Sequence, residues 1–455
     1  MNVPDTRRLG EQPVGRLLLG FSIPAITGMV VGSLYTVINR AFLGNVVGPE
    51  AIAGLSICMP IAFAIMAFGV LIGTGSGALV SIRLGQQRRE DAELILGQAV
   101  TIALIMAVVL TIGFRIALDP LLVLLGASPR VLPYAREFMH VILLGSVFQY
   151  LAFGINNIIR AEGNPRLAML TMFLNAGLNI ALDVLFILVF RWGVTGAAVA
   201  TVMAQAASAC WTLAHFRSSR SVLRLRWSAM RLRPAIVREI LVLGLAPFTM
   251  HLVGSLVNLL MNRGLVRYGG DDAVSAYGVI NALAMLILMP VLGIAQGAQP
   301  IIGFNHGAGL PARVRRALGL SILAATAVLL VGFAVVQTFP DALIRSFDKD
   351  ARILDIGTRG MRICLALAPV IGVQIVASHF FQAIGKAKAA LTLTLLRQVI
   401  VLIPLLLVLP RIWGLDGVWL SLPVSDAVST ALTAIALGWQ LRLSPSAPGT
   451  SSATS

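Results

Sequence analysis

The residues best able to do chemistry lie on one predicted helix, in an apolar stretch that begins at residue 170. Asn175, Asn179 and Asp183 are spaced four residues apart, so on a helix all three share one face. An ionised carboxylate is costly in hydrocarbon, so intramembrane acids face a bundle interior or a wet cavity and commonly mark an ion pathway. We therefore predict that Asp183 carries a coupling ion. The alternative is a buried acid that only pins two helices together by hydrogen bonds.

Three further polar residues are predicted at the depth of Asp183. Thr201 lies on the next apolar stretch, which returns after a tight turn at residues 191–193. Tyr35 and Asn39 are one helical turn apart in the first apolar stretch, with Asn39 about 12 Å from its outer end. Oxygen ligands of this kind suit a proton relay, or a sodium ion held by Asp183, Asn179 and Asn39. The alternative is an interhelical hydrogen-bond network without an ion.

Composition identifies the elements that must position these residues. The chain has 455 residues, of which 58% are hydrophobic and 12% charged, and its mean hydropathy is +0.89. Such values exclude a soluble domain and indicate an all-α integral membrane protein with twelve transmembrane helices. The spans are expected at 15–46, 50–84, 91–118, 133–160, 165–190, 193–217, 235–267, 272–305, 311–343, 351–384, 388–410 and 414–441.

The net charge of +16 arises from basic residues in the loops between these spans. There they act as topology signals, so we exclude nucleic acid as a partner. Most Lys and Arg residues fall on one side if the N-terminus is inside, which predicts a multi-pass protein of the plasma (inner) membrane with both termini cytoplasmic. The expected parts are a cytoplasmic N-terminal segment 1–14, a six-helix bundle 15–217, a basic cytoplasmic linker 218–234, a second six-helix bundle 235–441 and a disordered cytoplasmic tail 442–455.

The chain also repeats itself with an offset of 221 to 223 residues. The matching positions are Pro24 with Pro247, Asn39-Arg40 with Asn262-Arg263, Gly75 with Gly297, Gly85 with Gly307, Ala161 and Gly163 with Ala383 and Gly385, and Trp192-Gly193-x-x-Gly196 with Trp413-Gly414-x-x-Gly417. Each repeat covers six spans, an even number, so the two repeats are parallel. Two parallel bundles favour a substrate site at their interface and alternating access, which is the architecture of a transporter.

Polar and methionine residues within the spans could line a substrate chamber, and methionine suits an adaptable surface. The candidates are Asn157, Met172, Asn175, Asn281, Met289, Gln296 and Gln299. For the methionines the alternative is core packing or lipid contact. The second half has no matching acid: Asp426, the one acid within its final span, is predicted to form a buried structural pair with Arg397, and the alternative is a second titrating site. Ion coupling is therefore expected in the first half.

The segment Gly73-Thr-Gly-Ser-Gly77 resembles a phosphate-binding loop only superficially, because it has no Walker lysine and lies inside an apolar span. We predict that it serves close helix packing instead. With no ATPase motif in the sequence, an ion gradient is the expected energy source. No cofactor is expected beyond the coupling ion, a proton or alternatively sodium.

Several motifs together suggest a family. They are Tyr35-Thr-Val-Ile-Asn39-Arg-Ala-Phe-Leu-Gly44, Arg160-Ala-Glu-Gly-Asn-Pro165, Asn179-Ile-Ala-Leu-Asp183, Gly193-Val-Thr-Gly-Ala-Ala-Val-Ala-Thr201 and the stretch 290–307. With twelve spans in two repeats, they resemble the MATE (multidrug and toxic compound extrusion) family over nearly the whole chain. The pattern is most similar to the DNA-damage-inducible branch, whose cation site lies in the N-terminal bundle.

The resemblance implies a secondary antiporter that exports cationic, amphipathic organic compounds in exchange for protons or sodium. It implies a functional cluster at Tyr35, Asn39, Asn179, Asp183 and Thr201, the same residues that depth selects. That branch usually has an aspartate where this chain has Asn39. The neutral amide leaves Asp183 as the lone carboxylate of the cluster, which favours a proton over sodium.

Two other classes of function agree less well with the sequence. A flippase or exporter of a lipid-linked or metabolite substrate predicts a basic central cavity, whereas the basic residues here fall mainly at span ends. An integral-membrane transferase needs clustered acids or histidines, and the five histidines are scattered. We therefore expect that the protein is not an enzyme and that it works as a monomer. Its expected partners are small organic cations and the lipid bilayer.

Overall fold

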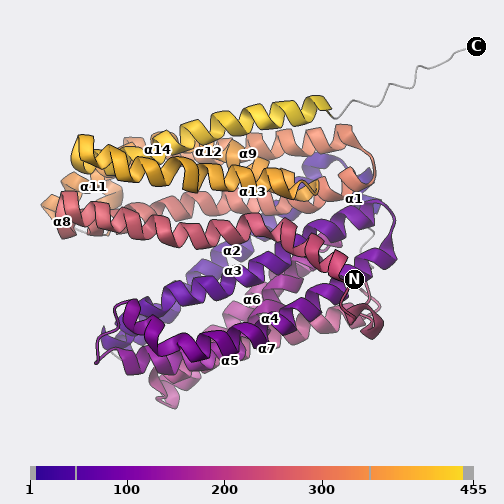
Figure 1. Cartoon of the computed structure of the whole chain (residues 1–455), viewed down its shortest axis with the longest axis horizontal. Helices are drawn as coiled ribbons and strands as arrows, with labels where there is room; N and C mark the ends of the chain where they lie inside the picture. Colours follow the sequence, from indigo (N-terminus) through magenta and orange to yellow (C-terminus); the bar gives the residue numbers. More distant parts are fainter. Residues whose placement is uncertain (1–6, 47–48, 348–349, 444–455) are drawn as a thin grey trace, which may run out of the picture. The chain divides into compact units, whose positions relative to one another are not determined.

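The computed structural model describes residues 7–46, 49–347 and 350–443, without the side chains of residues 36–38, 40–46, 49–51 and 443. Residues 1–6 of the predicted N-terminal segment and residues 444–455 of the predicted tail lie outside this range. Every regular element in the described part is helical (Figure 1). The predicted fold class, all-α with helices long enough to span a membrane, is confirmed.

A short helix, α1 (Arg7–Glu11), precedes the first span, and the predicted spans of the first half follow closely. They are α2 (Val14–Val46), α3 (Pro49–Gly85), α4 (Arg89–Leu124), α5 (Leu132–Ala161), α6 (Pro165–Asp183) continued by the π-helix η1 (Val184–Val189), and α7 (Gly193–Arg217). The linker to the second half contains one turn of 3₁₀-helix, η2 (Trp227–Met230).

The second half consists of longer and more broken helices. They are α8 (Pro234–Gly307), α9 (Pro311–Thr338), α10 (Pro340–Arg345), α11 (Ala351–Cys364), α12 (Ala368–Ala383), α13 (Ala387–Leu395), the π-helix η3 (Leu396–Leu402) and α14 (Ile403–Leu443).

Nine of the described helices are long and apolar enough to cross a membrane. Two of these are double length: α8 has non-helical backbone at Gly270, and the run from α13 to α14 is broken at Trp413 and Gly414. The helices α11 and α12 make one further span, bent by 52°. Counting each double helix twice and adding the bent pair gives the twelve predicted spans.

The sequence repeat is also visible in the backbone. Gly163 and Gly385 follow equivalent helices with φ of 98° and 78°, and Gly193 and Gly414 follow equivalent tight turns with φ of 57° and 56°. Positive φ is the conformation that glycine adopts without steric cost. The repeated glycines are therefore required by repeated turns, and the predicted relation between the two halves is confirmed.

Contacts among the Cα atoms group the described residues into two units. Unit 1 holds residues 7–8 and 23–252, and unit 2 holds residues 9–22 and 253–443. Helix α2 therefore begins in unit 2 and continues into unit 1, whereas α8 begins in unit 1 and continues into unit 2. This grouping differs from the predicted sequence bundles at the starts of two helices, and the predicted bundle limits remain a prediction.

Glycines allow the starts of α2 and α8 to pack closely against neighbouring helices. In unit 2, a Cβ on Gly297 would lie 2.8 Å from the backbone nitrogen of Ser22 in α2. In unit 1, a Cβ on Gly75 would lie 2.0 Å from the carbonyl oxygen of Ile240 in α8. Because Gly75 and Gly297 are repeat equivalents, the two units use the same kind of backbone-to-backbone contact.

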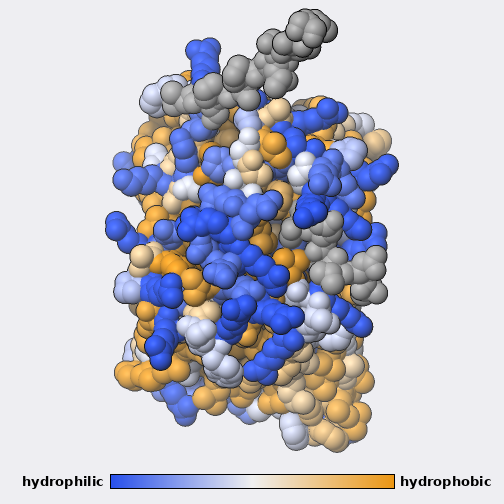
Figure 2. All heavy atoms as spheres, turned by 90° about the vertical axis from the view of Figure 1, so that its right-hand side faces the viewer, coloured by the Kyte–Doolittle hydropathy of each residue, from blue (hydrophilic) through white to orange (hydrophobic). Residues whose placement is uncertain are grey.

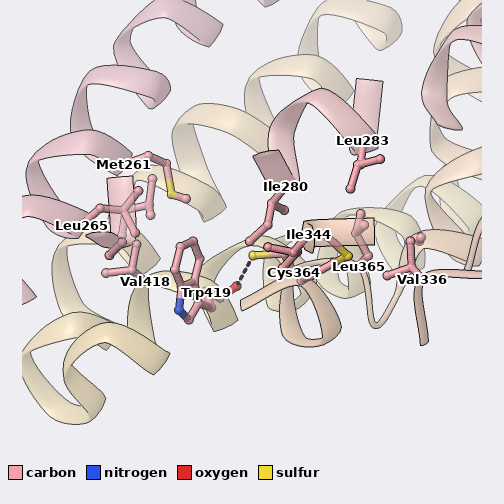
Figure 3. Packing of buried hydrophobic residues seen from close by; sticks show 14 of the residues in the cluster. Met261, Leu265, Ile280, Leu283, Val336, Ile344, Cys364, Leu365, Val418 and Trp419 are labelled. Atoms are coloured by element: carbon pink, nitrogen blue, oxygen red, sulfur yellow. Dashed lines mark hydrogen bonds between the residues drawn. The ribbon is translucent and has the colours of Figure 1, made fainter. Parts of the chain in front are cut away.

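Each unit has its own packing. In unit 1, α5 packs against α3, α4, α6 and α7, which lie side by side in Figure 1. In unit 2, α12 packs against α9 and α14. Figure 3 shows a buried cluster of unit 2 around Trp419, where the Cys364 thiol approaches the Trp419 carbonyl at 3.9 Å.

Candidate functional site

Asp183 is the last residue of α6, and its side chain is fully buried. The helix is fixed at its start by Asn164, whose side chain accepts a hydrogen bond from Leu167 N at 3.2 Å, and by Pro165 in the first position. Directly after Asp183 the backbone changes to the π-helix η1. Such π segments inside helices are frequent at functional sites. The predicted key residue thus lies where the helical hydrogen-bond pattern changes.

The turn that follows brings α7 back against α6. Phe186 and Trp192 stack with ring centroids 5.0 Å apart and planes at 1°, and Trp192 N donates to Phe186 O at 2.9 Å. Arg191 and Gly193 both have positive φ, which reverses the chain within three residues. The tight turn predicted at 191–193 is therefore confirmed, and it places Thr201 beside α6.

Asn179, Asp183 and Thr201 form one hydrogen-bonded cluster. In one orientation of the Asn179 amide, Nδ2 donates to Thr201 Oγ1 at 3.2 Å. In the other, Nδ2 donates to Asp183 Oδ2 at 3.0 Å and Oδ1 accepts from Thr201 Oγ1 at 3.2 Å. The second orientation satisfies the carboxylate as well as the amide, so it is the better assignment when Asp183 is ionised.

Asn39 and Asp183 lie equally far along their helices from one shared contact in unit 1. A Cβ on Gly28 of α2 would lie 2.5 Å from Met172 Sδ of α6, so the two helices touch there. They run in the same direction, and Asn39 and Asp183 are each 11 residues beyond that contact. At 1.5 Å per residue, both are about 16 Å further along.

Tyr35 and Asn179 are likewise each seven residues beyond the Gly28–Met172 contact. Tyr35 is partly buried, and the Oδ1 of Asn39 is buried without a hydrogen-bond partner among the described atoms. The structure thus brings Asn179, Asp183 and Thr201 into contact. It places Tyr35 and Asn39 at matching heights, without a described hydrogen bond from Asn39 to the other three.

Asp183 differs from the other buried carboxylates in its partners. Among the described side chains, buried Glu93 pairs with Arg89 and Arg226, Glu162 with His215, and Asp426 with Arg397, whereas Asp183 forms no ion pair. Its Oδ1 atom is buried and has no hydrogen-bond partner there either. A buried carboxylate without a counter-charge is costly unless a proton or a cation neutralises it. No group of three His, Cys, Asp or Glu side chains that could hold a metal ion occurs within the described residues.

The predicted substrate-chamber residues divide between the two units. Unit 1 holds Asn157, Met172 and Asn175, and unit 2 holds Asn281, Met289, Gln296 and Gln299. Asn175 Oδ1 and Gln299 Nε2 are buried atoms without a described hydrogen-bond partner, whereas Asn281 is exposed. Asn157 accepts from Arg160 at 2.9 Å, and its side chain packs closely on Gly73 of α3. Their role in substrate binding remains a prediction.

Two structural predictions from the sequence are confirmed. Arg397 Nε donates to Asp426 Oδ1 at 2.9 Å, so these residues form the expected pair in unit 2. In the Gly73–Gly77 segment, a Cβ on Gly73 would lie 3.0 Å from Gly154 Cα, which is the close helix packing predicted in place of a phosphate loop.

Sequence reasoning missed several buried polar residues outside the cluster. Asn156 Nδ2 donates to Ala168 O at 3.0 Å and ties α5 to α6, the helix that carries Asp183. Gln98 and Glu162 hold the linker between the two halves. Their signal was present, because each is a polar residue in or next to an apolar run. Their partners lie too far along the chain to be inferred.

Comparison with known proteins yields one family. A family model described as MatE matches residues 24–185 and 248–408. The multidrug export protein MepA of Staphylococcus aureus is 26% identical over 435 residues, which is 95% of each chain. A solved structure of the MATE multidrug transporter DinF-BH in complex with a small molecule is 40% identical and has a TM-score of 0.89, covering 94% of this chain and 96% of that one. An outward-facing multidrug resistance MATE transporter, 24% identical with a TM-score of 0.91 over 98% and 99% of the two chains, supports the fold alone.

The two matched segments coincide with the two halves of the sequence repeat, so the family model recognises the repeat itself. MATE proteins are multi-pass membrane transporters and not enzymes. The identity with DinF-BH extends over almost the full length of both chains and places the resemblance within one branch. This chain belongs to the MATE family, in its DinF-like branch.

Proposed function

We propose that the protein is a secondary multidrug antiporter that exports cationic, amphipathic organic compounds in exchange for protons. MepA is named a multidrug export protein, and the multidrug transporter DinF-BH was solved in complex with a small molecule. Alternating access of two parallel six-helix repeats supplies the route, and a proton moving down its gradient supplies the energy. In the proposed orientation both termini are cytoplasmic, in the plasma (inner) membrane, because the basic residues concentrate on that side.

The observation that carries this proposal is Asp183. It is a fully buried carboxylate within a membrane span, with neutral Asn179 as its hydrogen-bond partner and without an ion pair among the described side chains. Asn179 and Thr201 hold its geometry without neutralising its charge. A proton does neutralise it, and a cationic substrate competes electrostatically with that proton. Exchange of one for the other is the simplest coupling that such a group allows.

Sodium is the alternative coupling ion at Asp183, Asn179 and Asn39. A hard cation such as sodium is held by several oxygen ligands, and each additional carboxylate among them strengthens the electrostatic attraction. Here Asn39 contributes a neutral amide at the height of Asp183, so the cluster holds a single carboxylate among the described side chains. We therefore favour the proton. A monomer suffices for this mechanism, because both repeats are in one chain.

The test uses everted membrane vesicles with an acidic interior. Addition of a cationic dye such as ethidium to vesicles that contain the parent protein is expected to release protons. Asp183→Asn keeps the size and hydrogen bonds of the side chain but cannot exchange a proton, so release should stop. Asp416→Asn is the matched control, because Asp416 is a partly exposed acid of unit 2 that pairs with Arg359.

The outcomes separate the alternatives. Equal proton release by Asp183→Asn and the parent would remove Asp183 from the coupling step. Dye export that requires sodium at fixed pH would replace the proton with sodium. If the parent neither exports dye nor releases protons, cationic drugs are not the substrate, and a lipid-linked or metabolite substrate becomes the proposal to test.

A further inference from the structure

The linker between the two halves is a fixed element of unit 1. We name residues 218–233, between α7 and α8, the strap. Gln98 of α4 donates to the carbonyl oxygens of Ala229 and Arg231, both at 2.7 Å, and accepts from Arg233 N at 2.9 Å. Thr101 Oγ1 donates to Met230 O at 2.9 Å. A Cβ on Gly97 would lie 2.5 Å from Ala229 O, so the strap lies directly on the backbone of α4.

The first part of the strap is held by buried acids. Ser221 Oγ donates to Glu162 Oε2 at 2.7 Å, and the other Glu162 oxygen bonds to His215 Nε2. Arg224 N donates to Glu93 Oε1 at 3.2 Å, and Arg226 pairs with Glu93 Oε2 at 3.1 Å. Buried polar groups of this kind hold a segment in one conformation when all their partners are present.

This anchoring gives the strap an inner and an outer face. Ser221, Leu223 and Ala229 are buried against unit 1. The outer face carries exposed arginines that form no ion pair among the described residues, namely Arg217 at the end of α7 and Arg220, Arg224, Arg231 and Arg233 of the strap. Between them, Trp227 is 77% exposed and Leu232 is 53% exposed. Figure 2 looks onto this end of the molecule, where hydrophilic side chains gather.

The position of η2 along α4 sets its depth. Thr101 lies 12 residues after Arg89, the first residue of α4, which is about 18 Å along the helix. The apolar run of α4 has already begun there, with Ile95 and Leu96. The strap therefore extends from the polar start of α4 to the beginning of its apolar part. This is the depth of lipid headgroups, where tryptophan is enriched.

We propose that the outer face of the strap binds the anionic phosphate headgroups of membrane lipids. The arginines supply donors for phosphate oxygens, and Trp227 and Leu232 supply apolar contact with the lipid at the same depth. A topology signal alone would need only positive charge in the linker. It would need neither the clamps from Gln98 and Glu93 nor exposed apolar side chains among the arginines. The assignment to the cytoplasmic leaflet rests on the orientation given under the proposed function.

The experiment uses the full-length protein in nanodiscs and needs no transport. Trp227 is the reporter, isolated from the other tryptophans by subtracting the signal of Trp227→Phe. Its fluorescence is quenched with brominated phosphatidylglycerol or, at equal mole fraction, with brominated phosphatidylcholine. The ratio of the two association constants measures preference for the anionic headgroup, and for the parent we expect a preference of at least tenfold.

The main variant changes four strap arginines to glutamine and spares Arg226, which pairs with Glu93. The four substitutions are Arg220→Gln, Arg224→Gln, Arg231→Gln and Arg233→Gln. Each arginine at a membrane surface strengthens binding to anionic lipid about fivefold. Loss of all four should therefore reduce the preference for phosphatidylglycerol over phosphatidylcholine to about one. Lysine at the same four positions should keep most of it. The matched control removes the same charge elsewhere, with glutamine at the exposed residues Arg130, Arg345, Arg352 and Arg411.

The results decide the proposal. Loss of preference in the strap glutamine variant, with preference kept in the lysine and control variants, supports it. Equal quenching by the two lipids in the parent overturns it, and so does a loss that is as large in the control variant. Because the readout is lipid contact at Trp227, failure here leaves proton exchange at Asp183 untouched, and failure of proton exchange leaves this result untouched.

Discussion

Asn179 is the residue that links the buried acid to the returning helix. Its two amide orientations correspond to different hydrogen positions on its neighbours: a protonated Asp183 can donate to the amide oxygen, whereas an ionised Asp183 must accept from the amide nitrogen. Thr201 adapts to either, because a hydroxyl both donates and accepts. In the structure Thr201 Oγ1 also lies 2.9 Å from Ala197 O in its own helix. The cluster therefore has a hydrogen-bond arrangement for each protonation state.

Thr201→Val tests whether the hydroxyl of Thr201 supports this hydrogen-bond arrangement. The substitution keeps the shape of the side chain but leaves Asn179 with one partner fewer, at a cost of about 1 kcal/mol. If the loss falls on one protonation state, the proton equilibrium shifts about fivefold, and dye-driven proton release should fall while protein yield stays near that of the parent. Thr201→Ser keeps the hydroxyl and should retain release. Equal loss in both variants would mean that packing, not the hydrogen bond, is what matters.

At the scale of elements, the second half uses a charged pair where the first half uses neutral groups. Arg397 lies in the π-helix η3, and its guanidinium is bonded to Asp426 of α14, while Ser425 Oγ donates to Arg397 O at 3.0 Å. Both halves thus contain a π segment in their fifth span, but only the first leaves its acid without a described counter-charge. This asymmetry agrees with coupling in the first half.

Asp426→Asn should destabilise the protein, because it leaves the Arg397 charge within the bundle without its partner. Breaking a buried pair costs about 3 to 5 kcal/mol, and the lower end applies because the Arg397 side chain is 21% exposed. Thermal unfolding in detergent measures the loss. The double change Arg397→Met and Asp426→Leu removes both charges and should recover most of the stability. If the double variant folds well but loses proton release, the pair belongs to the coupling machinery after all.

Most elements could be predicted from the sequence because each depends on local chemistry. Apolar length defines the spans, a Trp-Gly turn defines the tight return before Thr201, and an acid in a final span requires a partner such as Arg397. The π-helix after Asp183 carries no local signal, so it was missed. The hydrogen bonds from Gln98 to the strap could not be predicted for another reason. The bond to Arg231 O joins residues 133 positions apart, and no local pattern indicates such a pairing.

In the whole molecule, two helices are divided between the units. The start of α2 belongs to unit 2, which holds the rest of α8, and the start of α8 belongs to unit 1, which holds the rest of α2. Two residues of unit 2 hold the segment before α2 in that unit. Asn305 and Arg313 both donate to Leu9 O, at 3.0 and 3.1 Å. Arg313 also donates to Gln12 O at 2.6 Å. Hydrogen bonds therefore hold the end of α1 and the turn that leads into α2 in unit 2, and the Gly297 contact holds the first part of α2 there.

Gly75→Ala and Gly297→Ala are expected to destabilise the protein by about 1 to 3 kcal/mol each, because the new methyl group meets backbone that cannot move aside. Thermal unfolding is the measurement. Gly113→Ala and Gly319→Ala are matched controls on α4 and α9, where a Cβ meets nothing within 4 Å. These two should be neutral or slightly stabilising, since alanine favours a helix. Equal behaviour of all four variants would contradict a role for close backbone contact.

Contacts between segments that are far apart in the sequence also determine when each segment can pack during synthesis. Arg313, which donates to the carbonyl oxygen of Leu9, is made 304 residues after it. At a translation rate of 5 to 20 residues per second, α1 is made roughly 15 to 60 s before Arg313, which binds it. A chain that ended after residue 252 would contain the first six spans but neither Asn305 nor Arg313, the residues that donate to Leu9 O. The segment around Leu9 therefore reaches its final packing only after Asn305 and Arg313 have been made, 296 and 304 residues later.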